Sequence, residues 1–145
     1  MMVIANHGTT NVHIIVADAA SAATLRAANE FSRYIFLMTG AKLTIHKAGR
    51  GTVGNADAAE ICVGLTGRAG EPDISALRND GYIHKTARNR LFLIGENDRA
   101  VLHAVYAFLE DELGCRFFTD TVEHVPKRSY LPIGEVDRIV VSPFE

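Results

Sequence analysis

The sequence contains no tryptophan, only two cysteines and only four prolines in 145 residues. Two cysteines are too few for the disulfide framework that stabilises many small secreted domains. The chain must therefore fold around a hydrophobic core, and a domain of this size buries roughly 68–70% of the surface that its unfolded chain exposes. Because 48% of the residues are hydrophobic and 22% are charged, the composition is that of one globular domain and excludes an intrinsically disordered chain.

Charge of one sign never accumulates along the chain. Fifteen basic and seventeen acidic residues give a net charge of −2, and neither kind forms a run. Nucleic-acid binding requires a basic patch, so we expect no nucleic-acid partner. No apolar stretch approaches the roughly 20 residues that span a membrane, and the first ten residues, MMVIANHGTT, lack the features of a signal peptide.

Motifs for metal or cofactor chemistry are also missing. The six histidines never occur at H-x-x-x-H spacing, and the chain has neither a G-x-S-x-G nor an S-x-x-K motif. The stretch GRGTVG, Gly49 to Gly54, matches the dinucleotide fingerprint G-x-G-x-x-G, but only six residues separate it from the predicted strand at Ile61. No helix fits between them, so we interpret this stretch as a loop and predict no cofactor and no metal.

Hydrophobic patterns predict two long helices. The first begins after Ser21 or Asp18 and reaches about Met38, and the second begins after Asn97 or Asp98 and reaches about Leu113. Gly40 and Gly114 follow the two helices, where left-handed C-caps are expected. The three carboxylates of LEDELG, 109–114, are consecutive and point about 100° apart, so they favour a solvated last turn rather than a catalytic pair.

Short runs rich in β-branched residues predict the strands. They are MVIA at the start, Val12–Ala17, Lys42–Lys47, the run EICVGL, and the pair Gly81–Thr86 and Arg90–Gly95. The last two are separated by a short turn and predict an antiparallel hairpin. In the tail, VEHVP and YLPIG predict short extended pieces whose prolines place them at an edge. This order predicts an α/β (α+β) fold, a two-layer sandwich with a mixed sheet and two main helices on one face.

Three stretches of the chain resemble a known family. They are AANEFSRYIFLMTGAKL, NDRAVLHAVYAFLEDELGCRFF and the ending VVSPFE. Together they resemble the N-terminal non-catalytic domain of bacterial α-glucuronidase-like glycoside hydrolases and, more distantly, the second domain of β-N-acetylhexosaminidases, from about Val12 to Phe144. The resemblance implies a small α/β sandwich with a zincin-like shape. The sequence has no H-E-x-x-H, so the resemblance brings no zinc chemistry with it.

The resemblance also implies a role. In that family the catalytic acids lie on a (β/α)8 barrel that follows this domain, and such a barrel needs about 200 residues or more. Residues 1–145 are then a single accessory domain of a longer protein, without catalytic residues of their own, and its partner is the downstream catalytic domain. The parent would act on polysaccharide in the periplasm or outside the cell. A homo-oligomer and a carbohydrate ligand stay open as further partners.

The stretch DELGCRFFTDTVEHVPK contains the predicted site residues. Gly114 ends the second helix, and Arg116, Phe117 and Phe118 follow at the return toward the sheet. Adjacent residues of an extended segment point to opposite sides, so one phenylalanine can join the core while the other meets a partner. We therefore predict that Arg116, Phe117 and Phe118 contact the neighbouring domain.

Two other functions remain as alternatives. A stand-alone glycan-binding module would need exposed aromatic rings as platforms, and in the absence of tryptophan the candidates are Tyr34, Tyr82 and Tyr130. A small stand-alone enzyme would need converging titratable groups. The cluster that the sequence offers for this purpose is His84, Glu96 and Asp98.

Overall fold

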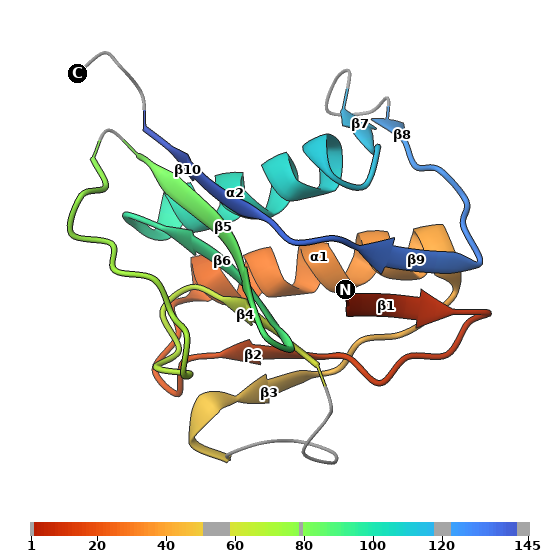
Figure 1. The fold of residues 1–145 in the computed structure, drawn as a ribbon, viewed down its shortest axis with the longest axis horizontal. Helices are drawn as coiled ribbons and strands as arrows, with labels where there is room; N and C mark the ends of the chain where they lie inside the picture. The colour runs from red at the N-terminus through yellow and green to blue at the C-terminus, as the bar shows by residue number, and fades with distance from the viewer. Residues whose placement is uncertain (1, 51–58, 79, 118–122, 142–145) are drawn as a thin grey trace.

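The computed structural model describes residues 2–50, 59–78, 80–117 and 123–141. Its main sheet has six strands, and two helices cover one face of it (Figure 1). In spatial order the strands are β10 (Asp137–Val140), β5 (Tyr82–Ala87), β6 (Arg90–Gly95), β4 (Glu60–Val63), β2 (His13–Val16) and β3 (Ile45–Lys47). The helices are α1 (Ala22–Thr39) and α2 (Asp98–Asp111).

The sheet is mixed, as predicted. Strands β3, β2, β4 and β6 are parallel to one another, whereas β5 pairs with β6, and β10 with β5, in antiparallel fashion. The predicted hairpin is confirmed, with Ala87 opposite Arg90 at its tight turn. The predicted two-layer arrangement is therefore confirmed, with both helices on one face and running in the same direction (Figure 1).

The helices begin where the sequence predicts. The Ser21 Oγ accepts a hydrogen bond from the Thr24 N–H at 3.1 Å, and the Asn97 Oδ1 accepts one from the Ala100 N–H at 2.9 Å, so each is an N-cap. Gly40 ends α1 with φ of 77° in the left-handed region. Helix α2 ends at Asp111, two residues before the predicted limit, and Gly114 has φ of 84° just beyond it.

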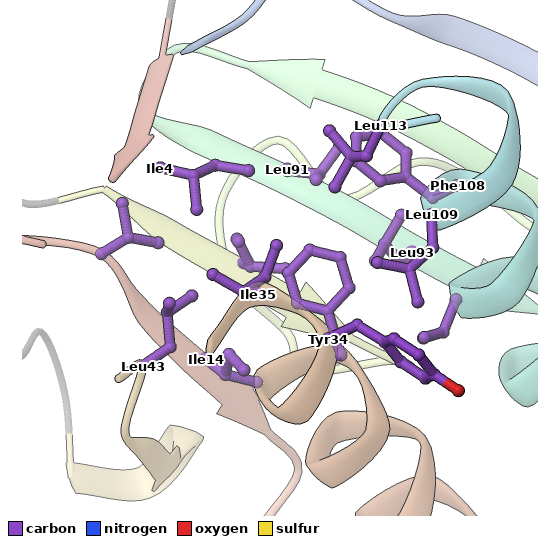
Figure 2. Close-up of a cluster of buried hydrophobic side chains, with 14 of the residues drawn as sticks. Ile4, Ile14, Tyr34, Ile35, Leu43, Leu91, Leu93, Phe108, Leu109 and Leu113 are labelled. Carbon is purple, nitrogen blue, oxygen red and sulfur yellow. The ribbon is translucent and has the colours of Figure 1, made fainter. Parts of the chain in front are cut away.

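The main core lies between the helices and the sheet. Alternate residues of β2, β4 and β6 point into it, among them Ile14, Ile61 and Leu91. Figure 2 shows Leu91 and Leu93 of β6 beside Phe108 and Leu109 of α2. Fully burying one such side chain contributes about 1.5–3 kcal/mol, so this face is the principal source of stability.

The opposite face of the sheet has a smaller core. Ile15, Cys62, Phe92 and Ile94 are buried there, with Ala48, Ile74 and Ala87 packed against them. Ile74 belongs to segment 64–80, which connects β4 to β5. Its described residues, 64–78 and 80, form neither helix nor strand, and they supply part of this cover. The two faces of one sheet are thus covered by different kinds of structure.

Short elements complete the fold. Strand β1 (Met2–Asn6) pairs antiparallel with β9 (Tyr130–Ile133) in a separate ribbon, and β7 (Arg116–Phe117) pairs with β8 (Glu123–His124). A single 3-10 turn, η1 (Ala48–Arg50), follows β3. Of the predicted strand Lys42–Lys47, residues Ile45–Lys47 are extended in the sheet. Within the described part of the chain, no helix is long and apolar enough to cross a membrane.

Candidate interface at the end of the second helix

The predicted site lies where the chain leaves α2. The Cys115 N–H donates to the Leu109 carbonyl at 3.0 Å, so the chain turns back over the last turn of the helix. The Arg116 Nη1 then donates to the carbonyl oxygens of Glu110 and Cys115, both at 2.9 Å. A guanidinium at this place satisfies the Glu110 carbonyl, which the last turn of the helix leaves without a helical partner, and lies at the negative end of the helix dipole. Arg116 nevertheless stays exposed to solvent.

Phe117 packs on the groove between the two helices. Its ring contacts Tyr34 of α1 edge-on, with centroids 5.2 Å apart, and Tyr106 of α2 in the same way, also at 5.2 Å. We call Tyr34, Tyr106 and Phe117 the aromatic seam. Edge-to-face pairs of this kind contribute about 0.5–1.5 kcal/mol beyond the area that they bury. Tyr34 is buried, but Tyr106 and Phe117 are half-buried, so the seam reaches the surface.

Charged groups line the rim of the aromatic seam. The Arg33 guanidinium lies 4.4 Å from the centre of the Tyr34 ring and pairs with Glu30 at 3.1 Å. Burial raises the pKa of the Tyr106 hydroxyl, and the Glu30 carboxylate raises it further. The seam therefore combines apolar rings with a polar rim, a composition that is typical of protein interfaces.

The outcome for the three predicted residues differs. The structure places Arg116 at the surface and Phe117 half-buried on the seam, whereas Phe118 lies outside the described residues. We expected one phenylalanine to join the core and its neighbour to meet a partner. The structure describes only the first of the two, Phe117. Contact of Arg116 and Phe117 with another domain stays a prediction.

The prediction of exposed tyrosines as sugar platforms is wrong for two of the three residues. Tyr34 and Tyr82 are only 3% and 6% exposed, because neighbouring rings cover them. Tyr34 is covered by Phe117, and the Tyr82 ring packs 5.0 Å from that of His84 and 5.1 Å from that of His103. Tyr130, on β9, is exposed.

The groups proposed for a stand-alone enzyme do not converge. His84 is fully buried, its Nε2 lies 2.8 Å from the Ala104 carbonyl of α2, and burial lowers its pKa. The imidazole is therefore neutral at pH 7 and donates from Nε2, which fastens β5 to α2. Glu96 instead accepts a hydrogen bond from the Asp80 N–H, and Asp98 is exposed in the first turn of α2. In the described ranges, no three His, Cys, Asp or Glu side chains form a group that could hold a metal ion.

Two further features bear on the motifs considered above. The Gly49 N–H donates to Asp18 Oδ1 at 2.7 Å, and a Cβ at Gly49 would collide with that carboxylate. Because the first glycine of GRGTVG has no side chain, the Asp18 carboxylate can approach its backbone closely. Residues 51–58, which include the motif from Gly51 onward, lie outside the described part. Burial raises the pKa of the Cys62 thiol to about 12, so this sulfur is unsuited to nucleophilic chemistry.

One surface feature was missed in the sequence. A shallow pocket of about 350 Å³ lies beside α1 and is lined by Asn29, Ser32, Arg33, Phe36 and Lys42. Phe36 is 51% exposed. The helical pattern contained the signal, because Phe31 and Ile35 define the buried side of this helix and Phe36 does not share it.

With this geometry established, the chain can be compared with known proteins. No protein-family model matches the chain, and no curated protein matches it either. Among solved structures, it resembles a family GH115 4-O-methyl-α-glucuronidase with specificity for decorated arabinogalactans, with a TM-score of 0.61 and 14% identity over 96% of this chain. It also resembles the GH20 β-N-acetylhexosaminidase of Streptomyces coelicolor A3(2), with a TM-score of 0.54 and 19% identity over 91% of this chain.

The likeness covers only part of each of those proteins. The chain spans 18% of the glucuronidase chain and 22% of the hexosaminidase chain. At such low identities the likeness concerns the fold. The chain therefore has the fold of a domain that occurs within larger glycoside hydrolases.

Proposed function

We propose that this chain is a non-catalytic N-terminal accessory domain of an α-glucuronidase-like glycoside hydrolase, and that it packs against a downstream (β/α)8 barrel. One observation carries the proposal: more than nine-tenths of the chain matches a portion of about one-fifth of each of two glycoside hydrolases. A fold hosts many functions, so the role has to come from the surface that would make the contact.

The surface that best suits this contact is the aromatic seam together with Arg116. The seam lies over the groove between α1 and α2, and β7, which carries Arg116 and Phe117, lies at the carboxyl end of α2 (Figure 1). Half-buried aromatic rings and an exposed arginine are enriched in interface cores. On the other side of the molecule, segment 64–80 already covers part of the sheet. We therefore assign the docking contact to the helix side.

The partners of three carboxylates support a structural role for the domain. Glycoside hydrolysis needs two carboxyl groups facing each other across the sugar, about 5–9.5 Å apart. In this chain Glu60 is held by two arginines, Asp80 by Asn97 and Arg99, and Asp111 by Arg138. These carboxylates serve to fasten one element to another. The domain would then support the barrel and order the edge of its active site, while the barrel performs the hydrolysis.

The first experiment is to sequence the natural gene beyond the codon of Glu145. We expect a following segment of at least about 200 residues with carboxylates at the ends of barrel strands. A stop codon directly after Glu145 would show that the accessory role is wrong.

A second experiment tests the docking surface in the full-length enzyme. Changing both Tyr106 and Phe117 to alanine should lower the thermal stability of the catalytic activity, because the barrel loses its support. The matched control is Tyr130→Ala, which removes an exposed aromatic ring away from the seam. Equal inactivation curves for the seam variant, the control and the unchanged enzyme would show that the seam is not the docking surface.

A further inference from the structure

Helix α1 carries a second surface feature, which shares Arg33 with the rim of the aromatic seam. The pocket beside Phe36 has a volume of about 350 Å³, within the range of about 300–1,000 Å³ that small-molecule sites occupy. Phe36 and Tyr34 are two residues apart, so their side chains leave the helix roughly 200° apart. The ring of Phe36 therefore points away from the rings of the seam.

An aromatic ring in this pocket is not needed for folding. Phe36 is half exposed, and alanine at the same place would favour the helix more strongly. Its neighbour Ile35 already provides the core contact of this turn. The ring therefore supplies an exposed apolar face that is bordered by the polar groups of the pocket.

The polar groups around Phe36 already have specific partners, which fixes what they can offer. The Asn29 Nδ2 donates one hydrogen to the Leu25 carbonyl at 2.9 Å, so its second N–H and its Oδ1 remain to bind a ligand. The Ser32 Oγ donates to the Leu43 carbonyl at 2.9 Å, and its oxygen can still accept.

The charges of the pocket are also defined. The guanidinium of Arg33 is balanced by Glu30, to which Nε and Nη2 both donate. Lys42 is exposed and supplies ammonium donors. The pocket thus offers an apolar ring face, the acceptors Asn29 Oδ1 and Ser32 Oγ, one amide N–H of Asn29 and the ammonium group of Lys42.

We propose that this pocket binds one pyranose ring of a neutral oligosaccharide. The C–H face of the sugar stacks on Phe36, and its hydroxyls, which both donate and accept, bond to Asn29, Ser32 and Lys42. A carboxylate or phosphate can only accept hydrogen bonds, so it would leave the acceptors Asn29 Oδ1 and Ser32 Oγ without a donor, whereas sugar hydroxyls can donate to both. The inference rests on the proposed function only because a parent glycoside hydrolase would bring polysaccharide to this surface.

The test is a titration of the ¹⁵N-labelled 145-residue chain, followed by the shifts of its amide signals. The probes are xylohexaose, cellohexaose and a β-1,3-linked galactooligosaccharide, with trigalacturonate as the acidic comparison. We expect at least one neutral oligosaccharide to shift signals of residues 29–42 in a saturable way. Phe36→Ala should weaken that binding at least about tenfold, as loss of an aromatic anchor does.

Two controls make the result specific. Tyr130→Ala removes another exposed aromatic, which does not line the pocket, and should leave the affinity unchanged. Lys42→Gln keeps the stem but removes the charge, so it should weaken the neutral ligand only several-fold. Because both Phe36 and Lys42 lie at the surface, an unchanged pattern of remaining amide signals will show that the variants fold.

Three results would overturn the inference. The first is that no neutral probe shifts any signal at about 10 mM, which is well above the roughly 1 mM dissociation constant of a weak complex. The second is that Phe36→Ala leaves the shifts unchanged, and the third is that trigalacturonate binds more tightly than every neutral probe. None of them touches the accessory role, which the reading frame beyond Glu145 tests separately. Conversely, a stop codon there would end the accessory role and leave a measured sugar affinity standing.

Discussion

The two faces of the central sheet are built from the same strands but are held in different ways. On the helix side, alternate strand residues meet the apolar stripes of α1 and α2 in one large cluster. On the other side, four buried residues are partly covered by the irregular segment 64–80, and ion pairs fasten this segment at both ends. Apolar burial therefore holds the first face, whereas charged anchors position the cover of the second.

The anchors are specific groups. Glu60, at the start of β4, is 1% exposed and pairs with Arg68 of the segment at 3.2 Å and with Arg90 of β6 at 2.9 Å. At the far end, the Asp80 carboxylate accepts from Asn97 and Arg99 beside the start of α2. The comparison teaches that a regular layer needs only its apolar pattern, whereas an irregular cover needs groups that fix its position.

The largest change in stability is expected when a buried phenylalanine is removed, and the two faces can be compared through one phenylalanine from each. Phe108→Ala, on the helix side, should lower the free energy of unfolding by about 4–5 kcal/mol, and Phe92→Ala, on the other side, by about 3 kcal/mol. Both side chains are fully buried, but the irregular segment can close over the space left at Phe92 more readily than two helices can at Phe108. Urea denaturation of both variants measures the difference. A larger loss for Phe92→Ala would show that the segment is as rigid as the helix layer.

The next prediction concerns the removal of the buried anchor Glu60. Glu60→Ala should destabilise the chain by about 3 kcal/mol, at the low end for a broken buried pair because Arg68 and Arg90 keep some exposure. The control is Glu30→Ala, which removes a more exposed pair on α1 and should cost about 0.3–0.5 kcal/mol. Chemical denaturation gives both values. Similar losses for the two variants would contradict the role of Glu60 as an anchor.

The same contrast explains how much of the fold could be predicted from the sequence. The helices, their caps at Ser21 and Asn97 and the β5–β6 hairpin follow from local patterns, and all are confirmed. Strand β10 was not predicted, because Asp137 and Arg138 make it polar and its pairing with β5 joins residues about fifty positions apart. The cover by segment 64–80 depends on ion pairs between distant residues and has no local pattern.

The candidate site shows the same limit. The return after Gly114 could be located in the sequence, and Arg116 and Phe117 do lie there. Burial of Tyr34 and Tyr82 could not be predicted, because it depends on rings contributed from distant parts of the chain by Phe117 and by His103. The exposure of Phe36 was within reach, since the helical spacing alone separates it from the buried side.

A smaller change in stability is expected from the pH dependence of His84, whose ring contacts the Ala104 carbonyl on the helix-covered face. Burial is the main cause that lowers the pKa of His84 below its usual 6.5; the hydrogen bond to the Ala104 carbonyl opposes this shift, Arg138 and His103 add to it, and Asp111 opposes it. The unfolded chain then binds a proton more readily, so the contribution of His84 is fully present above pH 6.5 and is lost as the pH falls below that value. One such group changes stability by at most about 1.4 kcal/mol per pH unit.

The measurement is urea denaturation between pH 7.5 and 5, in steps of about half a unit around the usual histidine pKa. His84→Gln keeps a donor for the Ala104 carbonyl but cannot titrate, so it should flatten the slope. The exposed His103→Gln should leave most of the slope in place. Stability that rises as the pH falls in the unchanged chain would contradict the burial of a neutral imidazole.

The smallest effect lies at the edge of the helix-covered face, where Arg116 ends α2. Arg116→Ala removes a cation from the carboxyl end of the helix, one hydrogen bond to the helical Glu110 carbonyl and one to the Cys115 carbonyl beyond the helix, and should cost about 0.3–1 kcal/mol. Arg116→Lys retains the charge but not the planar group that reaches two carbonyls, so it should recover part of the loss. Thermal unfolding in low and high salt separates the two contributions, because salt screens the dipole term. If both variants unfold like the unchanged chain, Arg116 is dispensable for the helix end, and its exposed guanidinium is then available in full to the proposed domain interface.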